Sequence, residues 1–273
     1  MDNTGKLAVV TGASSGIGYE LAVQFAQHGF DLLIVAEDEG ITQAAEDLTQ
    51  LGTEVQSVQQ DLASHEGVEA FYRAIAATGR PVEAIAINAG VGLGGKFWET
   101  DLEKEVNIIN LNVMSTVHLA KRVVQDMVKR AQGGKILLTS SIAAEMPGSY
   151  EAVYSASKAF VLSFAEALHY ELKEKGITVT ALQPGPTDTN FFHRAEMDDT
   201  KVGAQKKDDP AVVAKQGFEA LMAGKDSVIA GSFKTRIQNT MNDLIPEQAK
   251  AKIHAGMAKP GSAASVKPEE KAS

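Results

Sequence analysis

The sequence of 273 residues contains no cysteine. Disulfide bonds, thiolate nucleophiles and cysteine-ligated zinc sites are therefore excluded. No apolar run reaches the ~18 residues that a membrane-spanning helix requires. Residues 1–6 lead into an apolar strand without a secretory pattern. The net charge of −9 argues against nucleic acid as the main partner, because phosphate backbones attract basic surfaces. We expect a cytoplasmic protein.

The composition that remains is that of an ordinary globular protein, with 44% hydrophobic and 22% charged residues. Short apolar runs alternate with amphipathic stretches, and this alternation predicts an α/β fold with a parallel sheet and right-handed crossovers. Ligands of such sheets bind beyond the carboxyl ends of the strands. We expect strands at residues 6–11, 31–36, 54–60, 82–87, 133–141, 177–183 and 226–231.

A glycine-rich turn connects the first strand to an amphipathic helix, and its glycines follow the pattern G-x-x-x-G-x-G. Glycines permit a tight turn and close approach of the backbone to a phosphate, while the helix N-terminus offers free N–H groups and a positive dipole end. A P-loop is excluded because no Lys-Ser/Thr pair follows. We expect a dinucleotide pyrophosphate here, bound by Gly12, Ser14, Ser15, Gly16, Ile17 and Gly18.

An acidic group follows the second strand, and Glu37 lies 19 positions after Gly18. A carboxylate at this spacing can accept hydrogen bonds from the adenosine ribose hydroxyls and would repel a 2′-phosphate. Ser15 supplies no cation to offset that repulsion. The sequence therefore favours NAD over NADP, with Asp38 able to share the role. The alternative is that the carboxylates only cap the next helix.

Two further strands end in polar residues that would lie at the same edge of the sheet. Asp61 could hydrogen-bond the adenine amino group, and Asn88 could brace neighbouring strands or touch the ribose. For both, the alternative is a helix cap or a turn residue. The cofactor residues expected at these strand ends are Asp61, Leu62, Asn88, Ala89 and Gly90.

Tyr154 and Lys158 are four residues apart in a helical pattern, so both side chains share one helix face. An ammonium near a phenol stabilises phenolate, and lowering the tyrosine pKa from about 10 to about 7 takes roughly 4 kcal/mol. Ser141 ends the preceding strand, where it could bond an alkoxide near the tyrosine. YxxxK alone is more often an ordinary surface pattern, and the other segments give it weight.

Taken together, these segments resemble the short-chain dehydrogenase/reductase family over about residues 5–231. TGASSGIG is similar to its glycine-rich cofactor motif, and INAG is similar to its usual NNAG, from which Ile87 departs. Ser141, Tyr154 and Lys158 match the catalytic residues of the family, and Asn112 matches its helix asparagine. PGPTDT fits its PG-x-x-x-T segment and adds to the cofactor residues Pro184, Gly185, Thr187 and Thr189.

The resemblance implies a Rossmann-like, doubly wound parallel sheet of about seven strands with helices on both faces. It implies an NAD(P)-dependent oxidoreductase that interconverts a secondary alcohol and a ketone by hydride transfer without a metal. Tyr154 would be the general acid and base, and Ser141 would bond the substrate oxygen. Lys158 would lower the tyrosine pKa and bind the nicotinamide ribose. Further, Asn112 would hold a water beside Lys158, and Thr189 the nicotinamide carboxamide.

A catalytically silent NAD-binding sensor or scaffold is the alternative function, which would bind NAD without turnover. We expect one Rossmann-fold domain over residues 1–231, with a substrate lid at 190–209. An amphipathic helical extension at 232–259 and a flexible tail at 260–273 would follow. A homodimer or tetramer is expected, and contact of the basic extension with a membrane is an open alternative. A hint of an apolar pocket comes from Phe97, Trp98, Met146, Phe191 and Phe192.

Overall fold

A computed structural model describes residues 5–232 and 246–266. Among these residues, seven parallel strands form one sheet in the order β3-β2-β1-β4-β5-β6-β7. The predicted doubly wound parallel sheet is confirmed. The strands are β1 Lys6–Thr11, β2 Phe30–Ala36, β3 Val55–Gln59, β4 Val82–Ile87, β5 Gly134–Thr139, β6 Ile177–Pro184 and β7 Ser227–Ala230.

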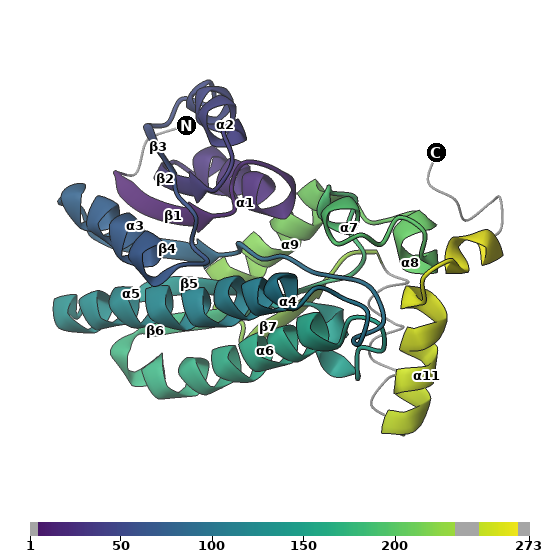
Figure 1. Ribbon diagram of the computed structural model, residues 1–273. Coiled ribbons are helices and arrows are strands. Elements are labelled where there is room, and N and C mark those ends of the chain that lie inside the picture. The colour runs from purple at the N-terminus through teal and green to yellow at the C-terminus, as the bar shows by residue number, and fades with distance from the viewer. Residues whose placement is uncertain (1–4, 233–245, 267–273) are drawn as a thin grey trace.

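Helices connect these strands and cover both faces of the sheet (Figure 1). The main helices are α1 Gly16–Gln27, α2 Gly40–Thr49, α3 His65–Ala77, α4 Leu102–Ile108, α5 Thr116–Arg130, α6 Ala152–Leu172 and α9 Pro210–Met222. Shorter helical segments are η2 Ile142–Glu145, η3 Lys173–Lys175, α7 Phe191–Arg194 and α8 Lys201–Ala204.

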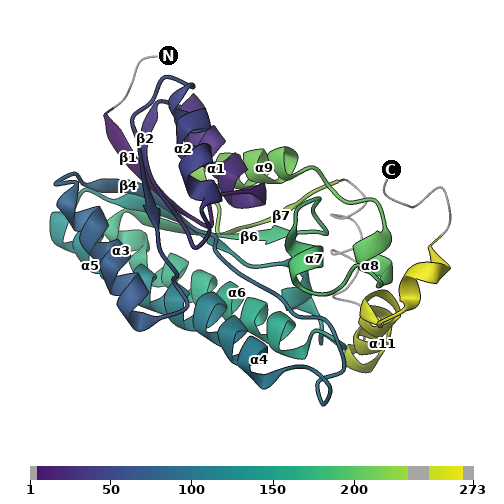
Figure 2. The same cartoon turned by 45° about the horizontal axis from the view of Figure 1, so that its top comes forward.

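Two hydrophobic cores lie on opposite faces of the sheet, because successive side chains of a strand point to opposite sides. On β1, Leu7 and Val9 face the core under α3, α5 and α6, whereas Ala8 and Val10 face the core under α1, α2 and α9. Figure 2 shows the two helical layers on either side of the strands. Burial on both faces explains why β1 and β2 are almost entirely apolar.

The chain reverses its winding direction where β1 lies beside β4. The loops that leave the carboxyl ends of β1 and β4 therefore run to opposite faces of the sheet. A crevice forms between such loops, and this is where doubly wound folds bind ligands.

Residues 102–130 form one continuous helical segment with three parts. Between α4 and α5 lies a π-helical segment, η1 Ile109–Ser115. π-Helical turns cost hydrogen-bond geometry and are frequent at functional sites. This one contains Asn112, whose side chain is 1% exposed.

The C-terminal part of the described chain packs beside α7 and α8 (Figure 1). Helix α11 spans Glu247–Ala258 and is followed by η5, Ser262–Ser265. Ala258 joins a small hydrophobic cluster with Phe192, Ala195 and Met197. This segment therefore covers the region where a substrate lid was expected.

Residues 261–266 differ from the flexible tail that the sequence favoured. Gly261 takes a left-handed conformation with φ of 76°, which turns the chain back. Its N–H then donates to Asp199 Oδ2 at 2.7 Å, and Lys201 N donates to Ser262 Oγ at 2.8 Å. Small polar residues thus anchor this stretch to α8. The remaining tail, residues 267–273, and the helix expected around Ile237 lie outside the described residues.

In the part of the chain that the structure describes, no helix is long and apolar enough to cross a membrane.

Candidate active site

A cavity of about 750 Å³ lies across the carboxyl ends of the strands. Asn112 lies behind its wall, and every other residue expected at the site lines it. Those residues are Gly12, Ser14, Ser15, Gly16, Ile17, Gly18, Glu37, Asp61, Leu62, Asn88, Ala89, Gly90, Ser141, Tyr154, Lys158, Pro184, Gly185, Thr187 and Thr189. These expected residues line one cavity although the first and last of them, Gly12 and Thr189, are 177 positions apart in the sequence.

The glycine turn is built so that larger residues cannot replace its glycines. Gly12 and Gly16 have φ of 66° and 57°, in the left-handed region. A Cβ on Gly18 would lie 2.0 Å from the carbonyl oxygen of Gly12. Ser15 precedes α1 without capping its amides, and the first turn of α1 has no acidic residue. The start of this helix therefore suits a pyrophosphate.

The two acidic residues after β2 have different partners. Asp38 accepts hydrogen bonds from Ser14 Oγ at 2.8 Å and from Gly40 N at 3.0 Å, so it is the residue that caps the next turn. Glu37 is half-exposed and forms an ion pair with Arg194 of α7. A cation therefore does face Glu37, contrary to the expectation drawn from Ser15. It comes from a segment 157 residues away, and no local pattern indicates it.

Asn88 braces three strands, which is one of the two roles the sequence left open. Its Nδ2 donates to the carbonyl oxygen of Thr11 at 3.3 Å, and its Oδ1 accepts from Thr139 Oγ1 at 3.1 Å. Asp61 accepts from the backbone N–H of Ala63 at 2.8 Å, which is a turn contact. Both side chains hold the strand ends that form the cavity wall.

Ser141, Tyr154 and Lys158 are buried together at the inner end of the cavity. Tyr154 and Lys158 share one face of α6, and the Lys158 Nζ lies 5.9 Å from the centre of the tyrosine ring. That Nζ donates to the backbone oxygen of Thr139 at 2.9 Å. Ser141 begins η2, and its Oγ accepts from Ala143 N at 3.1 Å.

Asn112 ties the π-helical segment to the helix that carries Tyr154. Its Nδ2 donates to Val91 O at 2.9 Å and to Ser157 Oγ at 3.0 Å, and its Oδ1 accepts from Val91 N at 3.0 Å. Ser157 Oγ in turn donates to the carbonyl oxygen of Tyr154 at 2.6 Å. A Cβ on Gly90 would lie 3.1 Å from both Asn112 Oδ1 and Lys158 Nζ, so a larger residue there would require these two side chains to shift.

The charges of the chain alone do not make Tyr154 acidic, which differs from the expectation that Lys158 lowers its pKa. Burial raises the pKa of Tyr154 well above its ordinary value, the charge of Glu151 raises it further, and a hydrogen bond from Ser141 lowers it. Burial also lowers the pKa of Lys158 to about 8. Desolvation dominates both groups, and the ammonium is directed at Thr139 rather than at the phenol.

Where residues 190–208 and helix α11 line the cavity, apolar side chains lie among charged ones. Of the residues expected in an apolar pocket, Met146, Phe191 and Phe192 line it. The Phe191 ring lies 5.2 Å from the ring of Tyr154. Phe97 and Trp98 are 62% and 78% exposed and do not line it. Sequence analysis missed the contribution of α11, which adds Ile253, His254, Met257 and Ala258.

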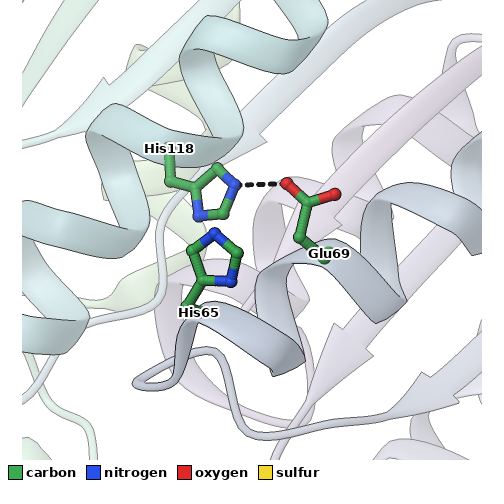
Figure 3. A group of neighbouring side chains, drawn as sticks. All are labelled: His65, Glu69 and His118. Atoms are coloured by element: carbon green, nitrogen blue, oxygen red, sulfur yellow. Dashed lines mark hydrogen bonds and ion pairs between the residues drawn. The ribbon is translucent and has the colours of Figure 1, made fainter.

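Within residues 5–232 and 246–266, one group of side chains has the spacing of metal ligands, namely His65, Glu69 and His118 (Figure 3). It lies on α3 and α5, away from the cavity lining. Arg122 donates two hydrogen bonds to Glu69 Oε1, at 2.9 and 2.7 Å, and His118 Nε2 lies 2.5 Å from the same oxygen. A guanidinium already compensates this carboxylate, so we interpret the group as an ion-pair network.

The fold and the cavity together define a class of protein. A glycine turn that leads from the first strand into a helix, at the crevice of a doubly wound sheet, is the architecture of dinucleotide-binding α/β proteins. The sequence profile described as short chain dehydrogenase matches residues 6–200. The chain belongs to this family of oxidoreductases, whose cofactors are NAD or NADP.

Relatives and solved structures support this assignment. The chain is 32% identical over 206 residues to "Probable oxidoreductase EphD" of Mycobacterium tuberculosis. The aligned region covers 73% of this chain and 35% of that protein. This chain thus spans about a third of the length of that relative.

Two solved structures carry a bound dinucleotide. A short-chain dehydrogenase from Sphingobium yanoikuyae in complex with NADPH superposes with a TM-score of 0.76 at 29% identity, covering 82% of this chain and 87% of that one. A 3-ketoacyl-(acyl-carrier-protein) reductase from Brucella melitensis complexed with NADH gives a TM-score of 0.72 at 25% identity, covering 82% and 96%. The relatives therefore include users of both cofactors.

Replacing Gly18 with alanine tests the glycine turn. Because the added Cβ would lie 2.0 Å from the Gly12 carbonyl oxygen, the turn must shift, and we expect binding of NAD(H) to weaken by at least tenfold. Fluorescence titration with NADH measures this, and circular dichroism checks the fold. Gly256→Ala is the matched control, since a Cβ there meets nothing within 4 Å. Equal affinity of both variants for NADH would contradict the assignment.

Proposed function

We propose that this protein is an NAD(P)-dependent oxidoreductase that interconverts a secondary alcohol and a ketone. The observation that carries the proposal is that Ser141, Tyr154 and Lys158 line the same cavity as the glycine turn. A group that exchanges protons thus lies in one space with a phosphate-binding turn. The apolar side chains in the cavity lining support a substrate with hydrophobic substituents on its carbinol or carbonyl carbon.

The glycine turn would hold the pyrophosphate, and Glu37 the adenosine ribose. Asp61, Leu62, Asn88, Ala89 and Gly90 would border the adenosine half. The nicotinamide half would lie against Thr189 and the strand exit of Pro184, Gly185 and Thr187. The bound dinucleotide supplies or accepts a hydride at the substrate carbon.

Tyr154 takes the proton from the alcohol oxygen, or gives it to the ketone oxygen. Hydrogen bonding to Ser141 lowers the pKa of Tyr154, and the same hydroxyl can bond the substrate oxygen beside the phenol. Lys158 binds the nicotinamide ribose and supplies positive charge behind the phenol. The positively charged ring of oxidised nicotinamide would also favour phenolate, because nearby cations lower the pKa of a phenol.

Asn112 is the fourth residue of the proposed mechanism. Its Oδ1 and the Lys158 Nζ both lie close to Gly90. We assign to Asn112 the role of holding a water beside Lys158 that connects it to solvent. Its bonds to Val91 and Ser157 fix the amide for that task.

NAD is the cofactor we propose as favoured, because Glu37 would repel a 2′-phosphate. Arg194 weakens that discrimination in the structure, since its guanidinium pairs with the same carboxylate. The balance of these two charges would therefore set the ratio of NAD to NADP use.

A homodimer or tetramer is also proposed. Apolar side chains are exposed along α4 and η1, at Val106, Ile109 and Met114, and on α6 at Phe160. We expect light scattering to give at least twice the chain mass, and Phe160→Glu to lower that mass. A monomeric mass for the wild-type protein would contradict the proposal.

Replacing Tyr154 with phenylalanine tests the reaction. We expect turnover to fall by about 10²–10⁴-fold, which is the usual contribution of general acid–base catalysis. NADH affinity should stay within about twofold, because the ring and its packing remain. The assay is NADH absorbance with a panel of secondary alcohols and ketones.

Two outcomes would contradict this proposal. Unchanged turnover in Tyr154→Phe would remove the role of the phenol. Tight NAD binding by the wild-type protein, with no turnover across the whole panel, would favour a sensor or scaffold instead.

Removing the charge of Glu37 or of Arg194 tests the preference for NAD over NADP. Glu37→Ala removes charge-assisted hydrogen bonds worth about 1.5–3 kcal/mol, so the ratio of kcat/KM for NAD over NADP should fall by about 10- to 150-fold. Arg194→Gln should change the ratio in the opposite direction, because the carboxylate loses its partner. An unchanged ratio in Glu37→Ala would refute the role of Glu37.

A further inference from the structure

Glu151 is a buried carboxyl group in the cavity wall. It is 6% exposed, immediately precedes α6 and lies three residues before Tyr154. Its side chain lines the cavity. The charge of this group raises the pKa of Tyr154. A bare carboxylate at this position therefore opposes the proton transfer proposed for the phenol.

His254 of α11 reaches this carboxyl group from the other side of the cavity. The His254 side chain is nearly buried, and its Nε2 lies 3.4 Å from Glu151 Oε2. Its Nδ1 lies 2.9 Å from the backbone oxygen of Ser149. A carbonyl oxygen only accepts hydrogen bonds, so Nδ1 must carry a proton. The tautomer of the ring is thereby fixed.

The 3.4 Å separation leaves room for one further proton to be shared between Nε2 and the carboxyl group. It belongs either to an imidazolium beside a carboxylate or to a carboxylic acid beside a neutral imidazole. Both arrangements have no net charge. Burial favours the uncharged form, because it raises the pKa of Glu151 to about 8 and lowers the pKa of His254.

We propose that Glu151 and His254 share one proton, and that the C-terminal helix thereby keeps negative charge away from Tyr154. His254 is then a positioning residue for the proton transfer, and the proposal rests on the function assigned to Tyr154. The C-terminal helix lies outside the segment that matches the family, residues 6–200.

Other ionisable groups face this pair from every packed element. On α6 these are Tyr154 and Lys158, and Tyr150 precedes the helix. Lys250 lies one turn before His254 on α11, is buried, and has a partner of its own. From the lid, the cavity lining includes Lys201, Lys206 and Lys207.

Removing His254 changes the pH at which the shared proton is lost. With two sites and a hydrogen bond available, the pair holds its proton to higher pH than the carboxyl group alone. In a His254→Asn variant, Asn can still donate to Ser149, but Glu151 loses its partner. Glu151 then ionises at lower pH and makes Tyr154 harder to deprotonate.

The test is the pH profile of kcat for oxidation of the fastest secondary alcohol in the panel, with the full chain and saturating NAD. For His254→Asn we expect the acid limb to move up by about one pH unit, which is tenfold in rate on that limb. In Glu151→Gln/His254→Asn the limb should return to the position seen with Glu151→Gln alone. A merely structural role of His254 would impair the double variant as much as the single one.

His118→Asn is the matched control, because it breaks a second histidine–carboxylate pair remote from the cavity (Figure 3). Its profile should equal that of the wild-type protein. An unchanged profile in His254→Asn, with turnover lost in Tyr154→Phe, would overturn the pair while leaving the proposed function intact.

A second measurement needs no substrate. The NMR titration of the His254 ring, assigned by its loss in His254→Asn, should differ between the wild-type protein and Glu151→Gln, because Nε2 then has no carboxyl group with which to share a proton. An identical titration in both proteins would show that the two groups share no proton.

Discussion

Burial of the phenol of Tyr154 is the constraint on which the rest of the site depends. Removing water makes phenolate costly, and it makes an ammonium costly as well, so the pKa of Lys158 falls to about 8. The hydrogen bond from Ser141 is the one favourable contribution that the protein makes to phenolate in this structure. Every further charge around Tyr154 therefore matters, since a dry site screens it little.

The fold supplies this dry site through its strand ends. Because the strands are parallel, the carboxyl ends of β1, β4 and β5 lie at one edge of the sheet. Asn88 joins these strand ends through hydrogen bonds to Thr11 and Thr139. Asn112 then connects the loop after β4 to α6 through Val91 and Ser157. The side-chain amides of Asn88 and Asn112 thus connect the glycine turn to the helix that carries Tyr154. Asn112 is buried, and its cost as a polar group in the interior is offset because most of its hydrogen-bonding capacity is used.

The sequence predicts what depends on local pattern. The strands and the glycine turn follow from spacing over a few residues, because hydrophobic period and turn chemistry are local. The sequence motifs also give the positions of Ser141, Tyr154 and Lys158, and the spacing from the glycines gives Glu37. The pairs Glu37–Arg194 and Glu151–His254 join residues that are 157 and 103 positions apart. No local sequence pattern around any of these four residues indicates its partner. The two pairs can therefore be found only in the folded chain. Desolvation is likewise a property of the packed protein, which is why the expected lowering of the Tyr154 pKa by Lys158 was not met.

Similarity to relatives likewise informs only part of the cavity. The family match ends at residue 200, whereas the cavity is also lined by Ile253, His254 and Met257. The glycine turn and Ser141, Tyr154 and Lys158 thus belong to the matched segment, and chain beyond that segment completes the cavity lining. Ala258 packs against Phe192, Ala195 and Met197, so the lid and the C-terminal helix share one hydrophobic cluster. A change in that helix would therefore alter both the packing of Phe192 and Met197 and the contact between His254 and Glu151. Under the proposed function, substrate choice and proton transfer would then change together.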